Sequence, residues 1–237
     1  MSAEILISKT SEEWTEHAAR WIAECLAGAL AERDRASLAL AGGSTPAGVY
    51  AHLARAFAGG GEGWPAVDWS RVDLYLGDER AVEPDHPEAN ARLAMEHLVR
   101  PLERSAPLLF LPVGIAHSVE AAAMAYEDLV PETLDVCLLG IGEDGHVASL
   151  FPGQETLDET ERRVVPVHDA PKPPPDRISL APAALTGSRH LAVLARGAGK
   201  AEPVRLALRV DGPAREIPAR LAREGTWLLD AEAAAAL

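Results

Sequence analysis

The sequence predicts an α/β fold: a mainly parallel central sheet with helices on both faces, in three layers, formed by residues 1–237 as a single domain. Short apolar runs that end in glycine, such as LDVCLLGIG over residues 134–142, alternate with segments whose apolar residues recur at helical spacing. Continuous apolar strands of this kind are typical of parallel sheets covered by helices on both faces. With 237 residues, 48% of them hydrophobic, the chain is long enough to bury a large core.

The N-terminal part of the chain predicts a helix, then a strand, a tight loop and a second helix. Thr10 and Glu13 form a capping-box pattern at the start of the first helix. One face of this helix is expected to carry Trp14, Ala18, Trp21, Ile22, Cys25, Leu26 and Leu30. The run SLALAG at 37–42 predicts a strand, and Pro46 is expected at the first position of the next helix, where proline is favoured.

The alternation of strands and helices continues toward the C-terminus. VDLYLG at 72–77 predicts a strand, and helices are expected near 88–102 and 119–129. Further strands are expected at 164–167, 177–180, 190–195 and 226–229. The segment DAPKPPPD at 169–176 contains four prolines, which remove donors and fix φ, so we expect an extended loop on the same domain.

Charge and composition argue against several classes of partner. The chain has 36 acidic and 22 basic residues and a formal net charge of −14. This balance disfavours binding to nucleic acid or anionic lipid, since both are polyanions. The N-terminal segment lacks the pattern of a secretory signal, and no stretch approaches the ~20 apolar residues of a membrane span. We therefore expect a cytoplasmic protein with no membrane contact.

Two loops that follow predicted strands carry residues suited to a phosphate group. In LALAGGSTPAG at 38–48, glycines let backbone amides approach a ligand, and the start of the next helix favours an anion. The candidate ligands in this loop are Gly43, Ser44 and Thr45. In GAGKAEPV at 197–204, Lys200 lies near the start of a helix, where its ammonium group can pair with phosphate.

Charged residues also follow the strand predicted at 72–77. Asp78 and Arg80, in GDER at 77–80, lie at the edge where parallel sheets bind ligands. Arg80 can form a bidentate contact with phosphate or carboxylate, and Arg177, beside the proline-rich loop, is a further candidate anion contact. A solvated strand end is the alternative interpretation of these charges.

The segment LGIGEDGHVASLFPG at 139–153 carries the strongest candidate for catalysis. A buried strand runs into a glycine-rich turn that exposes His146 at the C-terminal end of the strand. Histidine is a natural general base near neutral pH, and the nearby Asp144 carboxylate can orient its ring and stabilise the imidazolium.

The sequence indicates neither a metal site nor another cofactor. It has no H-E-x-x-H motif and no regular ligand spacing, and Cys25 and Cys137 are too far apart for a zinc knuckle. The G-x-S-x-G pattern of serine hydrolases is absent around every serine.

Five segments, taken in this order, resemble the 6-phosphogluconolactonase family, which is related to the glucosamine-6-phosphate deaminases. They are AGGSTP at 41–46, GDER at 77–80 with DHP…N ending at Asn90, LGIGEDGHVASLFP at 139–152, PKPPPDRISL at 171–180 and GAGKA at 197–201. Deaminases tend to have an aromatic residue where this chain has Arg80, and an FNEP-like sequence where SLFP follows His146. Ala89 departs from the lactonase pattern, which commonly has serine before this asparagine.

The resemblance implies hydrolysis of 6-phospho-D-glucono-1,5-lactone to 6-phospho-D-gluconate, a step of the pentose phosphate pathway, without a cofactor. The expected partner is thus a small phosphorylated sugar lactone. The residues implied to contact it are Gly43, Ser44, Thr45, Lys200 and Arg80. His146 would be the base that removes a proton from water, whereas Asp144 as its partner and Arg177 as an anion contact rest on side-chain chemistry alone.

Two other functions stay open at this point. A deaminase or isomerase acting on an amino-sugar phosphate would need a carboxylate base at C2 of the sugar, and Asp78 is a candidate for that role. A sugar-phosphate-sensing module is the alternative from a different class, because the effector domains of some transcriptional regulators resemble this fold. The acidic balance and the lack of a spare segment for a helix-turn-helix disfavour sensing.

Overall fold

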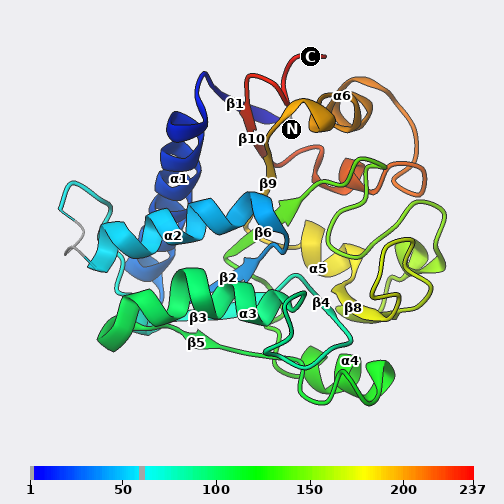
Figure 1. Cartoon of the computed structure of the whole chain (residues 1–237), viewed down its shortest axis with the longest axis horizontal. Helices are drawn as coiled ribbons and strands as arrows, with labels where there is room; N and C mark the ends of the chain where they lie inside the picture. The colour runs from blue at the N-terminus through cyan, green and yellow to red at the C-terminus, as the bar shows by residue number, and fades with distance from the viewer. Residues whose placement is uncertain (1–2, 59–61) are drawn as a thin grey trace.

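The computed structural model describes residues 3–58 and 62–237, which form one parallel and one antiparallel sheet (Figure 1). The larger sheet has seven parallel strands in the order β1-β10-β9-β6-β2-β3-β5. Its strands are β1 (Glu4–Ser8), β2 (Ala36–Leu40), β3 (Val72–Leu76), β5 (Leu108–Leu109), β6 (Val136–Gly140), β9 (His190–Ala195) and β10 (Thr226–Asp230). The prediction of a mainly parallel central sheet is confirmed.

The smaller sheet, of three antiparallel strands, was not predicted. Its strands, in order across the sheet, are β4 (Asp78–Arg80), β8 (Arg177–Leu180) and β7 (Val164–Val167). The chain passes from one sheet to the other at Gly77. The N–H group of Gly77 donates to the carbonyl oxygen of Leu40 in the main sheet, and its own carbonyl oxygen accepts from Leu180 in the small sheet. The predicted strands at 164–167 and 177–180 therefore exist, but they pair with each other.

The predicted helices are present, with differences at the start of the second helix and in the helix expected near 88–102, whereas the helix Pro182–Thr186 was not predicted. The helices are α1 (Ser11–Glu32), α2 (Ser44–Ala58), α3 (Asn90–Ala94), α4 (Val119–Glu127), α5 (Pro182–Thr186) and α6 (Ala201–Arg209). The helix predicted at 88–102 is irregular, since α3 continues as a π-helical turn over Met95–Val99 and a 3-10 helix over Arg100–Ser105.

The starts of α1 and α2 show how side chains satisfy helix ends. The capping box is confirmed, because the N–H group of Glu13 donates to Thr10 Oγ1 at 3.1 Å and the N–H group of Thr10 donates to Glu13 Oε2 at 3.3 Å. The position expected for Pro46 is wrong: α2 begins at Ser44, so Pro46 is the third helical residue. Proline is tolerated there because the first four N–H groups of a helix have no intrahelical acceptor.

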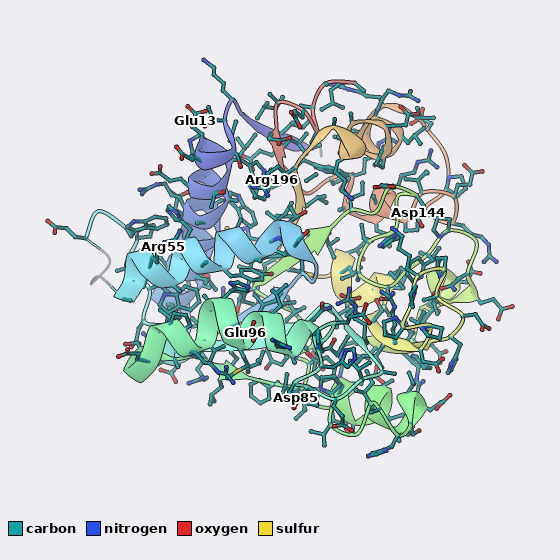
Figure 2. The ribbon with its side chains drawn as sticks, in the orientation of Figure 1. Glu13, Arg55, Asp85, Glu96, Asp144 and Arg196 are labelled. Atoms are coloured by element: carbon teal, nitrogen blue, oxygen red, sulfur yellow. The ribbon has the colours of Figure 1, made fainter. Side chains whose placement is uncertain are left out.

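The main sheet separates two hydrophobic cores and so forms the middle of three layers (Figure 1). Leu38 and Leu138 pack with α1, α2 and α3 on one face. Ala39 and Cys137 pack with α4, α5, α6 and the small sheet on the other. Exposed charged side chains on the outer layer of the first face include Glu13, Arg55 and Glu96 (Figure 2).

The arrangement of the central strands positions the site. Between β6 and β2 the chain changes its direction across the sheet: β3 and β5 follow β2 on one side, whereas β9 and β10 lie beyond β6 on the other. Open α/β sheets bind ligands at such a point, outside the carboxyl ends of the strands. No helix formed by the described residues is long and apolar enough to cross a bilayer.

Candidate active site

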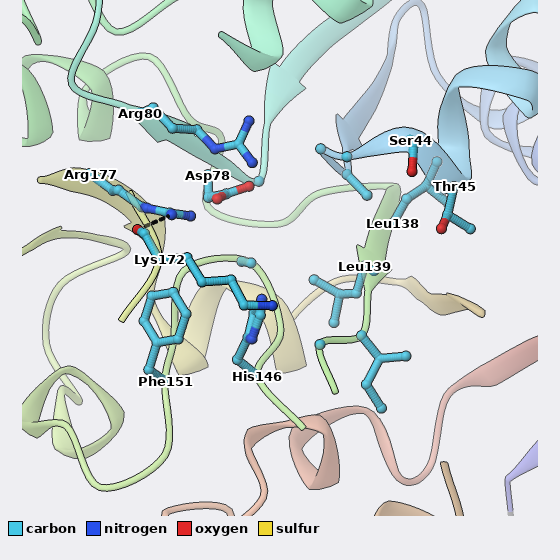
Figure 3. A pocket seen from close by; sticks show the side chains of 18 of the residues that line it. Ser44, Thr45, Asp78, Arg80, Leu138, Leu139, His146, Phe151, Lys172 and Arg177 are labelled. Atoms are coloured by element: carbon cyan, nitrogen blue, oxygen red, sulfur yellow. Dashed lines mark hydrogen bonds between the residues drawn. The ribbon is translucent and has the colours of Figure 1, made fainter. Parts of the chain in front are cut away.

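A cavity of about 300 Å³ lies at the C-terminal ends of β2, β3 and β6 (Figure 3). Of the nine predicted site residues, eight line it: Gly43, Ser44, Thr45, Asp78, Arg80, His146, Arg177 and Lys200. The ninth, Asp144, is not part of the lining but contacts His146. The structure thus brings together residues that are up to 157 positions apart in the sequence, from Gly43 to Lys200.

A tight turn after β6 holds His146 against Asp144. Asp144 Oδ1 lies 2.5 Å from His146 Nδ1 and also accepts the backbone N–H group of His146 at 3.2 Å. Gly145 has φ +83°, and the N–H group of Gly142 donates to the carbonyl oxygen of His146 at 2.8 Å. A Cβ atom at position 142 would lie 2.0 Å from His146 Nδ1, so this turn requires glycine there.

The charge states of His146 and Asp144 show which ring nitrogen of His146 can accept a proton. Burial lowers the pKa of His146 below the usual 6.5, although the charge of Asp144 offsets part of the effect. Burial alone would raise the pKa of Asp144, but the charge and hydrogen bonds of His146 outweigh it and lower that pKa. An ionised carboxylate only accepts, so Nδ1 carries the hydrogen and Nε2 has the free lone pair. His146 is therefore neutral near pH 7 and able to accept a proton at Nε2.

The aromatic ring of Phe151 contacts both His146 and Arg177. The centroid of the Phe151 ring lies 4.7 Å from that of His146, and the Cζ atom of Arg177 lies 5.6 Å from the Phe151 ring. Phe151 is only 2% exposed. Ala148, between the histidine and the phenylalanine, has φ +49°, a conformation that costs a non-glycine residue energy and is often found at functional sites.

Asp78 presents a buried carboxylate to the cavity, with a fixed orientation. Ser149 Oγ donates to Asp78 Oδ2 at 2.6 Å, and Asn90 Nδ2 donates to Asp78 Oδ1 at 3.0 Å. The side chain is 6% exposed. Because both oxygens have a partner from the protein, the carboxylate is held ready to accept a hydroxyl group of a ligand.

The guanidinium of Arg80 is bound to the protein through Nη1, whereas its Nε atom has no partner in the described part of the chain. Its Nη1 atom donates to the carbonyl oxygen of Glu88 at 2.6 Å and to Asn90 Oδ1 at 2.7 Å. Among the described residues none accepts a hydrogen bond from its buried Nε atom. The edge that contains Nε and Nη2 is thus suited to a bidentate anion.

Glu79 supports Arg80 from within the protein. Its Oε1 atom accepts the backbone N–H groups of Arg80 and Asn90, both at 2.8 Å. Burial raises the pKa of Glu79 to about 7, although these hydrogen bonds lower it in part. Glu79 therefore fixes the backbone on both sides of the Arg80–Asn90 contact.

The loop between β2 and α2 has the form of an anion site. Gly43 has φ +88°, and the 15-residue helix α2 begins directly afterwards at Ser44. Tyr50 Oη donates to the carbonyl oxygen of Ala41 at 2.9 Å and ties the loop to the helix. Lys200 lines the same cavity, and burial lowers its pKa. Unpaired N–H groups at a helix start, together with a lysine, favour a phosphate.

Lys172 is the charged cavity residue, among those described, that the sequence analysis did not predict. It lies in the proline-rich loop 169–176, lines the cavity, and its charge acts on both His146 and Lys200. Helical or strand periodicity carries no information about a loop of this composition. The one available signal was that Lys172 is one of three lysines in the chain, next to the predicted site residue Arg177.

In residues 3–58 and 62–237, no group of three or more His, Cys, Asp or Glu side chains is arranged to hold a metal ion. Cys25 and Cys137 are both free thiols.

Comparison with known proteins shows the family. The family model described as glucosamine-6-phosphate isomerases/6-phosphogluconolactonase matches residues 9–229. The 6-phosphogluconolactonase of Mycobacterium leprae is 38% identical, with 99% of this chain and 98% of the relative covered. That of Streptomyces coelicolor is 39% identical, with 99% and 94% covered.

Solved structures with similar folds support the same family. The 6-phosphogluconolactonase of Trypanosoma brucei has a TM-score of 0.80 at 29% identity, over 99% of this chain and 98% of that one. A monomeric glucosamine-6-phosphate deaminase has a TM-score of 0.80 at 25% identity, over 99% and 100%. The chain therefore belongs to the glucosamine-6-phosphate isomerase/6-phosphogluconolactonase family.

Proposed function

We propose that this enzyme hydrolyses 6-phospho-D-glucono-1,5-lactone to 6-phospho-D-gluconate, a step of the pentose phosphate pathway. The observation that carries the proposal is His146, which lines the cavity while its Nδ1 atom is paired with Asp144. The cavity is rich in positive charge although the chain as a whole has a net charge of −14. Its cationic side chains are Arg80, Lys172, Arg177 and Lys200.

The reaction begins with a water molecule between His146 and the lactone carbonyl. His146 Nε2 takes a proton from the water as the water oxygen attacks the carbonyl carbon, and Asp144 stabilises the resulting imidazolium through Nδ1–H. In the tetrahedral intermediate the bond from carbon to the ring oxygen breaks. The imidazolium returns its proton to the departing ring oxygen, which becomes a hydroxyl group, and the product is a carboxylic acid that ionises.

The two ends of the substrate would meet different groups. The phosphate would lie against the start of α2 at Ser44 and Thr45, with the unpaired edge of Arg80 and with Lys200 as cationic contacts. This contact orients the reacting ring and lowers the entropic part of the barrier. Lys172, whose charge acts on His146, would stabilise the oxyanion that forms at the carbonyl.

The direct test follows acid release from freshly prepared 6-phosphogluconolactone, with and without purified protein, after correction for spontaneous hydrolysis. We expect enzyme-dependent hydrolysis that His146→Gln removes. Ammonia release from glucosamine 6-phosphate is measured in parallel. Ammonia release without lactone hydrolysis would contradict the proposal and assign a deaminase with Asp78 as its base.

A further inference from the structure

The guanidinium of Arg177 binds the protein itself. Arg177 is 5% exposed. Its Nη2 atom donates to the carbonyl oxygen of Lys172 at 2.7 Å, the hydrogen bond drawn in Figure 3, and its Nε atom donates to that of Pro174 at 2.9 Å. Nη2 also lies 3.5 Å from the carbonyl oxygen of Pro173, and Nη1 lies 3.4 Å from Ser149 Oγ. Arg177 thus contacts three successive carbonyl groups of the proline-rich loop.

This loop has few hydrogen-bond donors of its own because of its composition. The proline residues at 171, 173, 174 and 175 have no N–H group. The N–H group of Ala170 donates to the carbonyl oxygen of Pro175 at 2.9 Å and joins the two ends of the loop. The carbonyl groups between these ends still require partners when buried. The planar guanidinium of Arg177 supplies donors in several directions, which a lysine ammonium does not do with the same geometry.

The contact with Lys172 connects Arg177 to the reaction. The carbonyl group of Lys172 is bound by Arg177, whereas the side chain of Lys172 lines the cavity. In Figure 3 this side chain extends from the loop toward His146. A lysine side chain is long and flexible, so its place in the cavity depends on a fixed backbone.

We propose that Arg177 is a positioning residue, which binds the carbonyl groups of residues 172–174 and thereby places the Lys172 side chain beside His146. The prediction that Arg177 is an anion contact is thereby replaced by an indirect role. The expected effect of Arg177 on kcat/KM rests on the proposed function, whereas the placement of the Lys172 side chain does not.

The first test does not depend on catalysis. The charged groups that act on His146 are Asp144, Asp78 and Lys172, and Lys172 lowers its pKa. The pKa of His146 is measured by NMR titration in the absence of substrate, with the signal assigned by its loss in His146→Gln. We expect Lys172→Met to raise this pKa, Arg177→Lys to raise it in the same direction, and the double variant to raise it no further than Lys172→Met. An unchanged pKa in either single variant would overturn the proposal.

The second test is a double-mutant cycle in kcat/KM on the phosphorylated lactone and on plain gluconolactone. Removal of one oxyanion-stabilising group typically costs about 10²-fold in kcat, so Lys172→Met should lose about this factor on both substrates. Arg177→Lys should also lose activity on both, and should cost less than about 2-fold in the Lys172→Met background, because coupled residues are not additive. Losses that multiply would show that Arg177 acts independently of Lys172. Losses confined to the phosphorylated lactone would show that Arg177 reads the phosphate directly. Either result would overturn the proposal.

Matched controls distinguish a loss of Lys172 positioning from a general loss of protein stability in the Arg177 variants. Arg205→Lys, an arginine of α6 whose hydrogen bonds go to the exposed Glu202, should change neither the pKa of His146 nor kcat/KM. Thermal unfolding and circular dichroism identify variants that fold. Should Arg177→Lys fail to fold, Arg177→Met, which keeps an apolar stem beside Phe151, takes its place in both tests with the same expected results.

Discussion

Gly42 and Asn90 touch across the cavity wall so closely that a Cβ atom at position 42 would lie 2.2 Å from Asn90 Oδ1. The side chain of Asn90 joins two site residues: its Oδ1 atom accepts from Arg80 and its Nδ2 atom donates to Asp78. The glycine after β2 thus leaves room for the amide that fixes the charged groups after β3.

Gly42→Ala should therefore lower kcat/KM by about 10-fold or more, because the new methyl group displaces Asn90 and with it Arg80 and Asp78. Gly48→Ala is the matched control, since a Cβ atom at position 48 in α2 has nothing within 4 Å. The control should keep full activity and be as stable as the parent or slightly more stable. Equal activity of the two variants would show that Asn90 does not need its present position.

His146→Gln should remove most enzyme-dependent hydrolysis, by about 10²–10⁴-fold in kcat, because glutamine cannot act as a general base. The fold should be kept, since the backbone bond from Gly142 to the carbonyl oxygen of residue 146 does not involve the side chain. Circular dichroism and thermal unfolding provide the control. Full activity in a folded His146→Gln variant would overturn the mechanism.

The pH dependence should follow the protonation of His146. Activity requires the neutral imidazole, and burial lowers its pKa, so kcat/KM should rise with pH to a plateau with a midpoint below 6.5. Asp144 raises the pKa of His146 relative to burial alone. Asp144→Asn should therefore move the midpoint to still lower pH, and should lower the plateau roughly 10²-fold because the imidazolium loses its anionic partner. A pH–rate profile of both proteins tests this, and an upward move of the midpoint in Asp144→Asn would contradict it.

The position of the site could be predicted because parallel strands end at one edge. The segments that form β2, β3, β6 and β9 have a clear apolar pattern. The loops that follow such strands are where open α/β sheets bind their ligands, so the site residues could be sought there. The pairing of β7 and β8 could not be predicted, because a segment of only four residues indicates a strand but not its neighbour.

The contribution of the proline-rich loop to the site could not be predicted from the sequence. Prolines indicate that the segment is not helical, but they do not specify where Lys172 lies. Arg177 was predicted as an anion contact because its charge is visible in the sequence. The carbonyl groups that bind this charge belong to the same loop, and only the folded structure shows them.

Chelators should leave the activity unchanged. The prediction rests on the donor set of the site, in which Asp78 is engaged by Ser149 and Asn90, and Asp144 by His146. Activity is measured after incubation with EDTA and removal of the chelator. Loss of activity on this treatment, with recovery on adding zinc or manganese, would refute the prediction.

Lys200→Ala and Arg80→Ala should each weaken hydrolysis of the phosphorylated lactone far more than that of plain gluconolactone. A hydrogen bond to a charged group contributes about 1.5–3 kcal/mol, or roughly 10- to 100-fold in kcat/KM, and a substrate without phosphate never makes that contact. For Lys200 the loss should fall mainly on KM. For Arg80, kcat should fall as well, because its Nη1 atom also holds Asn90.

The competing view is that both residues are surface charges whose removal changes little. Arg205→Ala provides the reference for this view, since Arg205 is a partly exposed cation of α6 that pairs with Glu202. Measuring kcat/KM for the two lactones with the parent protein and the three variants separates the views. A much larger loss on the phosphorylated substrate than on plain gluconolactone in Lys200→Ala and Arg80→Ala, with Arg205→Ala unchanged, is the expected result. Equal losses on both substrates would show that neither side chain reads the phosphate, because only a contact with the phosphate distinguishes the two lactones.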